Sequence, residues 1–169
     1  MKLEIIELSK LQSIKEQIDE AIWMFFNRRS AVAIHTIVGA AHQSLHDITN
    51  RKISMLKNEN AASNSGKGNE WFTRLNKEFN FLKHGQKDSE EYLSFGPLMH
   101  TFYLYDCVNM YIIHTGETHF NHQLFRGWFN IANRYLAAPE HKALLDLVAI
   151  DEMNPENYEY FALQLRENS

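Results

Sequence analysis

Three histidines on one predicted helix are the first residues whose spacing could do chemistry. His35, His42 and His46 are separated by seven and four residues, which places them within about 40° of one line along a helix. His42 and His46 have the i, i+4 spacing that lets two imidazole nitrogens reach one metal ion. The line lies about 100° from the apolar stripe of that helix, so we expect the rings at the border between core and solvent. There they could bind metal, shuttle protons or form hydrogen bonds.

The metal hypothesis for these three histidines needs further ligands. Structural and catalytic zinc sites use three or four protein ligands that converge, and the nearest additional candidates are His119 and His122. The sequence has no H-E-x-x-H motif and no pair of E-x-x-H motifs. A hydrogen-bonded polar edge therefore explains the pattern better than a metal site, and we expect no cofactor.

A carboxylate in the most apolar segment is the second candidate. Asp106 lies with Asn109 on the inward side of the predicted helix over 97–116. An ionised carboxylate is costly there without a partner, so a donor should reach it. We favour a buried hydrogen-bond network that joins helices over a catalytic carboxylate of raised pKa.

The third candidate is the pair Asn80 and His84, one helical turn apart near the end of the predicted helix over 70–84. This side points away from Leu75 and Leu82, so we expect it to face water or a second subunit. The neighbouring polar and basic residues that could hold a phosphate are Asn76, Lys77, Lys83 and Arg74.

The segment from Phe79 to Gly85 resembles the R-N-x-x-x-H motif of the HEPN family. Asn80 and His84 match its last two named positions, Gly85 suits the common H-G ending, and Phe79 stands where the arginine belongs. The resemblance covers about residues 30 to 85 at most. It implies a small α-helical domain that often dimerises, in a family that includes metal-independent ribonucleases and nucleotide-binding or inactive members.

The missing arginine decides between these activities. In the family the arginine and the histidine act together on the RNA backbone, so its absence favours a binding or regulatory module for RNA or nucleotide. The alternatives are a ribonuclease with His84 as general acid or base and Asn80 orienting it, and the histidine-ligated metal protein. A looser arginine–histidine spacing occurs in Arg28 or Arg29 with His35 and in Arg134 with His141, close to the number expected by chance.

Apolar residues at helical spacing define the elements that must position these groups. They predict helices over about 9–27, from 30 to Leu56 at most, over 70–84, 97–116 and 117–136, and two more from 139 and 154. A capping box at Ser9–Gln12 and a closing Gly116 support the boundaries. The polar stretch over about 58–69 predicts a mobile loop within one domain. We therefore expect an all-α, single-domain bundle of about seven helices over residues 1–169.

Composition limits the setting and the partners. The 169 residues are 44% hydrophobic, with no apolar run of about 20 and no secretory pattern, so we expect no membrane association. The lone Cys107 should pack as a small hydrophobe, which suits a reducing cytoplasm. A net charge of −4 argues against wholesale attraction to nucleic acid, although residues 51–87 hold eight Lys or Arg against three Glu. Phe125 and Phe129 beside the inward residues of 117–136 predict a homodimer.

Overall fold

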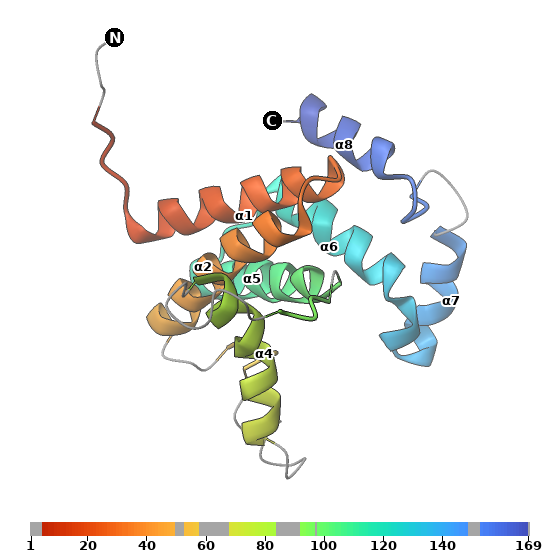
Figure 1. Cartoon of the computed structure of the whole chain (residues 1–169). Coiled ribbons are helices and arrows are strands. Elements are labelled where there is room, and N and C mark those ends of the chain that lie inside the picture. The colour runs from red at the N-terminus through yellow and green to blue at the C-terminus, as the bar shows by residue number, and fades with distance from the viewer. Residues whose placement is uncertain are drawn as a thin grey trace.

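The computed structural model describes residues 5–49, 53–57, 68–83, 92–96, 98–148 and 153–168, and only the backbone of residues 68–72, 74, 144, 147 and 148. Within these ranges the chain is helical without strands, which confirms the all-α bundle (Figure 1). The helices are α1 (Lys10–Phe26), α2 (Ala31–Ile48), α4 (Gly68–Lys83), α5 (Met99–Thr115), α6 (Phe120–Ala132), α7 (Pro139–Val148) and α8 (Tyr158–Glu167), with a 3-10 turn η1 (Arg134–Leu136). None of the described helices combines the length and the apolar content that a membrane crossing requires. The predicted loop over 58–69 lies outside the described residues except for its last two, which begin α4.

The first helix begins where the capping box predicts. Ser9 Oγ accepts from Gln12 N at 3.1 Å, and Gln12 Oε1 accepts from Ser9 N at 2.8 Å, so two backbone donors at the helix start are satisfied. Gly116 adopts φ 72°, a left-handed conformation that favours glycine, and ends α5.

Helix α2 is the centre of the arrangement. It packs most extensively against α5 and α1, while α4 lies across it and one end of α4 extends beyond the other helices (Figure 1). Helices α6 and α8 both contact α1, and α7 contacts α6 and η1. Because α2 is covered on several sides, polar groups on it must find partners inside the protein.

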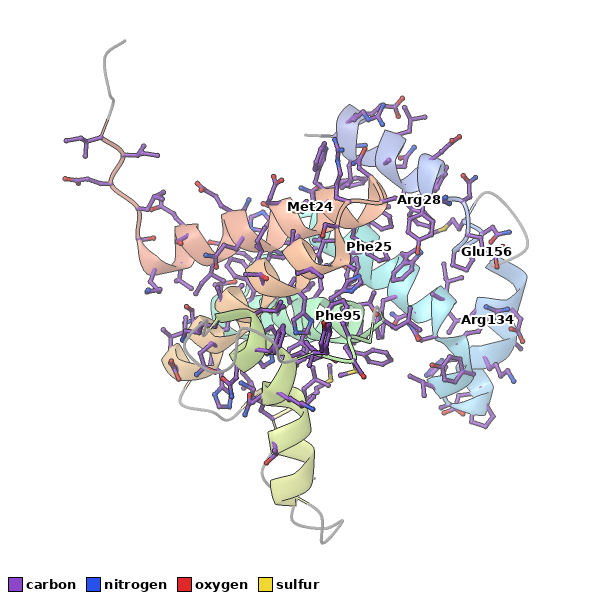
Figure 2. The ribbon with its side chains drawn as sticks, viewed as in Figure 1. Met24, Phe25, Arg28, Phe95, Arg134 and Glu156 are labelled. Carbon is purple, nitrogen blue, oxygen red and sulfur yellow. The ribbon has the colours of Figure 1, made fainter. Side chains whose placement is uncertain are left out.

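Aromatic side chains fill the interior between α1, α6 and α8. The Phe25 ring meets those of Phe125 and Trp128 edge-on at centroid distances of 5.6 and 4.5 Å, and Phe26 stacks on Phe161 at 5.0 Å (Figure 2 labels Phe25). Such pairs stabilise a core beyond the area that they bury.

Phe125 and Phe129 belong to this interior, which corrects the expectation drawn from them. Their exposed fractions are 0% and 5%, because Phe125 enters the aromatic cluster and Phe129 is covered by the Phe102 and Tyr105 rings of α5. Neither ring is available to a second copy of the chain.

Three predicted boundaries differ from the structure. Helix α2 ends at Ile48 rather than near Leu56, because residues 53–57 turn back toward α5. The segment after Ala132 tightens into η1 instead of continuing α6 to Leu136. Asn154 and Pro155 form a separate turn, in which the Pro155 carbonyl accepts from Trp128 Nε1, and α8 begins later, capped by Asn157.

Helix α4 is attached through a close approach to a glycine. A Cβ added to Gly39 of α2 would lie 2.0 Å from Phe79 Cε1, so the Phe79 ring lies directly on the α2 backbone. Tyr103 of α5 donates its hydroxyl to the Leu75 carbonyl at 2.9 Å. These contacts bring the middle of α4 against the bundle.

Replacing Gly39 by alanine should therefore destabilise the protein by about 1–3 kcal/mol, since the methyl group collides with the Phe79 ring. Urea unfolding followed by circular dichroism measures the change. The matched variant Gly127→Ala in α6, where the nearest atom to an added Cβ is 4.0 Å away, should be neutral or stabilising by up to about 1 kcal/mol. Adding Phe79→Leu to Gly39→Ala should recover part of the loss, and equal stability of Gly39→Ala and the parent would contradict the proposed contact.

Candidate functional site

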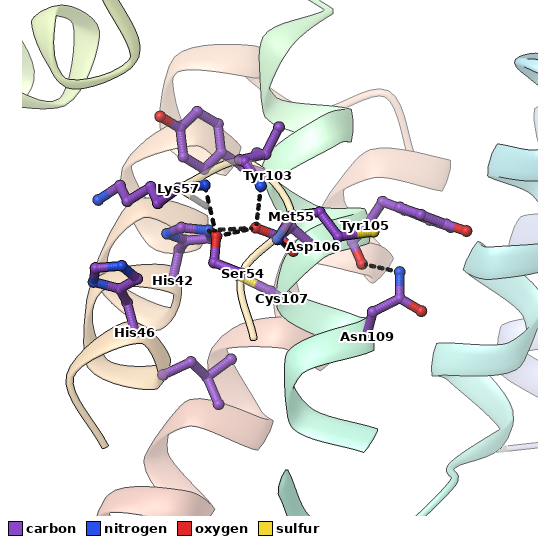
Figure 3. A network of polar contacts seen from close by, with 12 residues as sticks. His42, His46, Ser54, Met55, Lys57, Tyr103, Tyr105, Asp106, Cys107 and Asn109 are labelled. Atoms are coloured by element: carbon purple, nitrogen blue, oxygen red, sulfur yellow. Dashed lines mark hydrogen bonds and ion pairs between the residues drawn. The ribbon is translucent and has the colours of Figure 1, made fainter. Parts of the chain in front are cut away.

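A buried polar network around Asp106 joins α2, α5 and the segment 53–57 (Figure 3). Asp106 Oδ2 lies 2.9 Å from His42 Nε2 and accepts the Ser54 hydroxyl at 2.7 Å. The backbone N–H of Met55 donates to Oδ1 at 2.9 Å, and that of Leu56 donates to Oδ2 at 3.2 Å. The expectation that donors reach a buried Asp106 is confirmed.

Asn109, predicted on the same inward side, does not join this network. Its side-chain amide donates to the Tyr105 carbonyl one turn earlier, at 2.9 Å. It therefore satisfies a group of its own helix, as Figure 3 also shows.

The geometry of the Asp106 network is suited to holding the fold rather than to attacking a substrate. Burial by itself would raise the pKa of Asp106, but hydrogen bonds from His42 and Ser54 outweigh it and keep the pKa below its ordinary value. Burial lowers the pKa of His42, and the contact with Asp106 opposes this only in part. In a Ser-His-Asp triad the histidine lies between the other two, whereas here Ser54 and His42 converge on the same carboxylate oxygen. Ser54 is 1% exposed, so a substrate could not reach it.

The three histidines of α2 lie inside the protein, so the expectation that they line the border with solvent is wrong. The exposed fractions of His35, His42 and His46 are 0%, 1% and 8%. The physical reason is the covering of that edge by α4 and by residues 53–57. His35 stacks on Phe79 of α4 at 4.1 Å, and His42 contacts Ser54 and Asp106.

The three rings also have different surroundings. The His35 imidazole has no hydrogen bond to the described residues, and its Nε2 lies 3.6 Å from Glu78 Oε2. Burial lowers the pKa of His35 to about 4, with the nearby His100 contributing in the same direction. His46 lies parallel to His42 at a centroid distance of 6.3 Å.

No group of three or more His, Cys, Asp or Glu side chains converges as a metal site in the part of the chain that the structure describes. His119 and His122, the additional ligands considered from the sequence, lie at the start of α6. His122 Nε2 is 3.5 Å from Asp19 Oδ1 of α1, and His119 Nε2 is 3.4 Å from Glu117 Oε2. The metal hypothesis thus gains no support from these positions.

The motif that resembles the HEPN family lies on α4 and beyond its end. Asn80 is exposed, as predicted, whereas His84 and Gly85 lie outside the described residues. Phe79, at the arginine position, stacks on His35 and packs on Gly39.

The predicted phosphate-binding residues share the outer side of the same helix. Lys77 and Lys83 are exposed and Asn76 is half-buried, while the side chain of Arg74 is not described. Both lysines are thus presented to solvent on α4.

The looser arginine–histidine pairs are not brought together as catalytic pairs. Arg28 lies over the Tyr158 ring at 4.8 Å and Arg29 over the Trp23 ring at 5.5 Å, while His35 is buried. Arg134 forms an ion pair with Asp146 at 2.8 Å and donates to the Ile131 carbonyl. Each arginine has a structural partner.

Ser54 and the backbone of residues 53–57 were missed from the sequence as partners of Asp106. The sequence pattern allows this helix to continue to Leu56 at most, so it does not reveal the turn at residues 53–57. The available signal was the buried carboxylate itself, since its unsatisfied oxygens require donors from a neighbouring segment.

Removing the Asp106 carboxylate should destabilise the protein more than removing the side chain of Asn109, the other polar residue on α5 considered above. Asp106→Ala leaves buried donors without an acceptor and should destabilise the protein by about 3–5 kcal/mol, with Asp106→Asn losing less, about 1–3 kcal/mol. Urea unfolding measures both, and the control Asn109→Ala should lose less than about 1 kcal/mol. If Asp106→Ala lost no more than Asn109→Ala, the network would not hold the fold as described.

Stability should fall as the pH is lowered from about 6.5 toward 4. Burial lowers the pKa of both His35 and His100 to about 4, below the ordinary 6.5 that they regain on unfolding. Between these pH values the unfolded state binds more protons than the folded state. Each histidine therefore lowers the free energy of unfolding by up to about 1.4 kcal/mol per pH unit as the pH falls. Urea unfolding at pH 7, 6 and 5 should show that the free energy of unfolding falls less steeply with decreasing pH in His100→Phe than in the parent. An unchanged slope in His100→Phe would contradict the burial of a neutral ring.

Comparison with protein-family models, with curated protein sequences and with solved structures finds no match to this chain. The resemblance to the HEPN family therefore rests on the residues of the motif itself. Asn80 is the matching residue whose position the structure describes, and Phe79 is the departing one. A function has to be argued from how these residues are placed.

Proposed function

We propose that this chain is an HEPN-like helical module that binds RNA or a nucleotide through the outer side of α4 and does not cleave RNA. The observation that carries the proposal is the position of Phe79. In the motif that the segment resembles, this position holds the arginine that acts with the histidine on the phosphate backbone.

Phe79 has a packing role that an arginine could not share. Its ring stacks on His35 with an interplanar angle of 20° and meets Tyr103 edge-on at 4.6 Å. Its close approach to Gly39 leaves no room for solvent between α4 and α2 at this point. An arginine here would lose the stacking on His35, and its guanidinium would be partly desolvated beside an imidazole whose lowered pKa leaves it uncharged at neutral pH.

The outer side of α4 carries polar and basic side chains that could bind a phosphate. Lys77, Asn80 and Lys83 are exposed, and positions 76, 80 and 83 follow one another at helical spacing on the polar side. Lysines neutralise phosphates without sequence preference, and asparagine can donate to phosphate, sugar or base. A local basic surface is needed because the whole chain carries a net charge of −4.

A binding experiment with a fluorescently labelled single-stranded RNA of mixed sequence tests the proposal. The double variant Lys77→Ala/Lys83→Ala should weaken binding about tenfold in low salt, and the slope of log K against log salt should fall by about 1.4 for two lost phosphate contacts. The matched control Lys142→Ala/Arg166→Ala, which removes two exposed cations from α7 and α8, should bind like the parent.

Three outcomes would contradict the proposal. Absence of RNA binding by the parent at low salt, or equal binding by both double variants, would exclude α4 as the binding surface. RNA cleavage by the parent that disappears in His84→Ala would instead establish the ribonuclease alternative. Equal absence of cleavage in parent and His84→Ala is the expected result.

The homodimer and the cytoplasmic location stay predictions beside this proposal. The homodimer loses the argument from Phe125 and Phe129, because both rings are buried in the core of one chain. Its remaining motivation is the HEPN resemblance, in which paired domains are common. Light scattering at micromolar concentration measures the oligomeric state directly.

A further inference from the structure

A cavity of about 530 Å³ lies between α5, α6, η1 and α7, apart from every residue considered above for RNA binding. Its walls include Tyr105, Phe129, Asn130, Leu136, His141 and Leu145. The volume falls in the range of small-molecule sites, which are mostly apolar with a few placed polar groups. The cavity is therefore large enough for a compact organic molecule.

One wall of the cavity is aromatic. The Tyr105 and Phe129 rings are stacked at a centroid distance of 4.0 Å with an interplanar angle of 18°. Phe102 meets Phe129 edge-on at 5.2 Å and supports it from the core. A planar guest could stack or pack edge-on against this wall, which aromatic rings favour over contact with a puckered ring.

No Lys, Arg, Asp or Glu is among the residues that line the cavity. The lining residues comprise apolar side chains, a tyrosine, two asparagines and a histidine. The nearby charges of η1 and α7 are engaged with one another, since Arg134 Nε and Asp146 Oδ1 are 2.8 Å apart (Figure 2 labels Arg134). An ionic guest would lose hydration without gaining a counter-charge, so a neutral guest is favoured.

Asn130 provides the directional contact. Its Oδ1 accepts the Tyr105 hydroxyl at 3.1 Å, and its amide nitrogen carries two N–H groups that can donate to a guest. The neighbouring Asn133 is occupied differently, because its amide donates to the Phe129 carbonyl and its oxygen accepts from Tyr135. A guest with a hydrogen-bond acceptor on its edge would complement Asn130.

We propose that this cavity is a binding site for a small, uncharged, planar aromatic molecule that carries a carbonyl or similar acceptor. The stacked Tyr105 and Phe129 rings favour a planar guest, the absence of Lys, Arg, Asp and Glu from the lining favours a neutral one, and the N–H groups of Asn130 favour one with an acceptor. The site is independent of the RNA-binding surface on α4 and stands or falls separately from it.

A nuclear magnetic resonance titration with benzamide tests the site. Benzamide should produce saturable shifts in the amide signals of Asn130, Ala137 and His141. Cyclohexanecarboxamide, which keeps the polar group but not the plane, and benzoate, which keeps the plane but adds charge, should each bind at least about fivefold more weakly. Equal affinity of the three probes, or benzamide shifts confined to other regions, would overturn the proposal.

Variants separate binding in the cavity from binding elsewhere. Ala138, directly before α7, lines the cavity, whereas Ala143 within α7 is exposed and does not line it. Ala138→Trp should fill the space and abolish the benzamide shifts, while Ala143→Trp should leave them unchanged. Tyr105→Leu should weaken binding about fivefold through loss of the aromatic wall. Benzamide binding that survives Ala138→Trp in a protein of parental circular dichroism would also overturn the proposal, whatever the outcome for RNA.

Discussion

The buried carboxylate of Asp106 is the interaction on which the arrangement depends. A charge with no exposed surface must have donors, and these come from two separate parts of the chain: His42 on α2, and the segment 53–57, which provides the Ser54 hydroxyl and backbone N–H groups. Each donor is useful only if its own element lies in the correct place relative to α5. The requirement to satisfy one carboxylate thus sets the packing of α5 on α2 and forces the chain to turn after Ile48.

The same covering of α2 governs which groups remain available for function. Segment 53–57 and α4 bury the histidine edge, so its imidazoles become parts of the core, and burial lowers the pKa values of His35 and His42. The two proposed binding sites therefore lie elsewhere, on the polar side of α4 and beside α7. Both regions lie at the periphery, where fewer helix contacts restrain the chain.

Phe79 links the fold to the proposed activity. One ring anchors α4 on the Gly39 backbone and at the same time occupies the position of the motif arginine. A protein that uses this position for packing retains a helix with an exposed Asn80 and two exposed lysines, which suits recognition of an anion without chemistry on it. The proposed aromatic site beside Tyr105 and Phe129 would add a second ligand class without involving that helix.

The order, type and approximate limits of the helices were determined by the sequence alone, because apolar spacing, the Ser9 capping box and Gly116 act within a few residues. The need of Asp106 for partners, the burial of Cys107 and the outward position of Asn80 also followed from local pattern. Only the tertiary structure decided which donors reach Asp106 and that α4 covers His35. It also decided that Phe125 packs against α1 and Phe129 against α5. The spacing of apolar residues along one helix indicates which of its sides is apolar. Whether a side is buried depends on which other helices and segments pack over it, and this packing is a property of the whole folded chain.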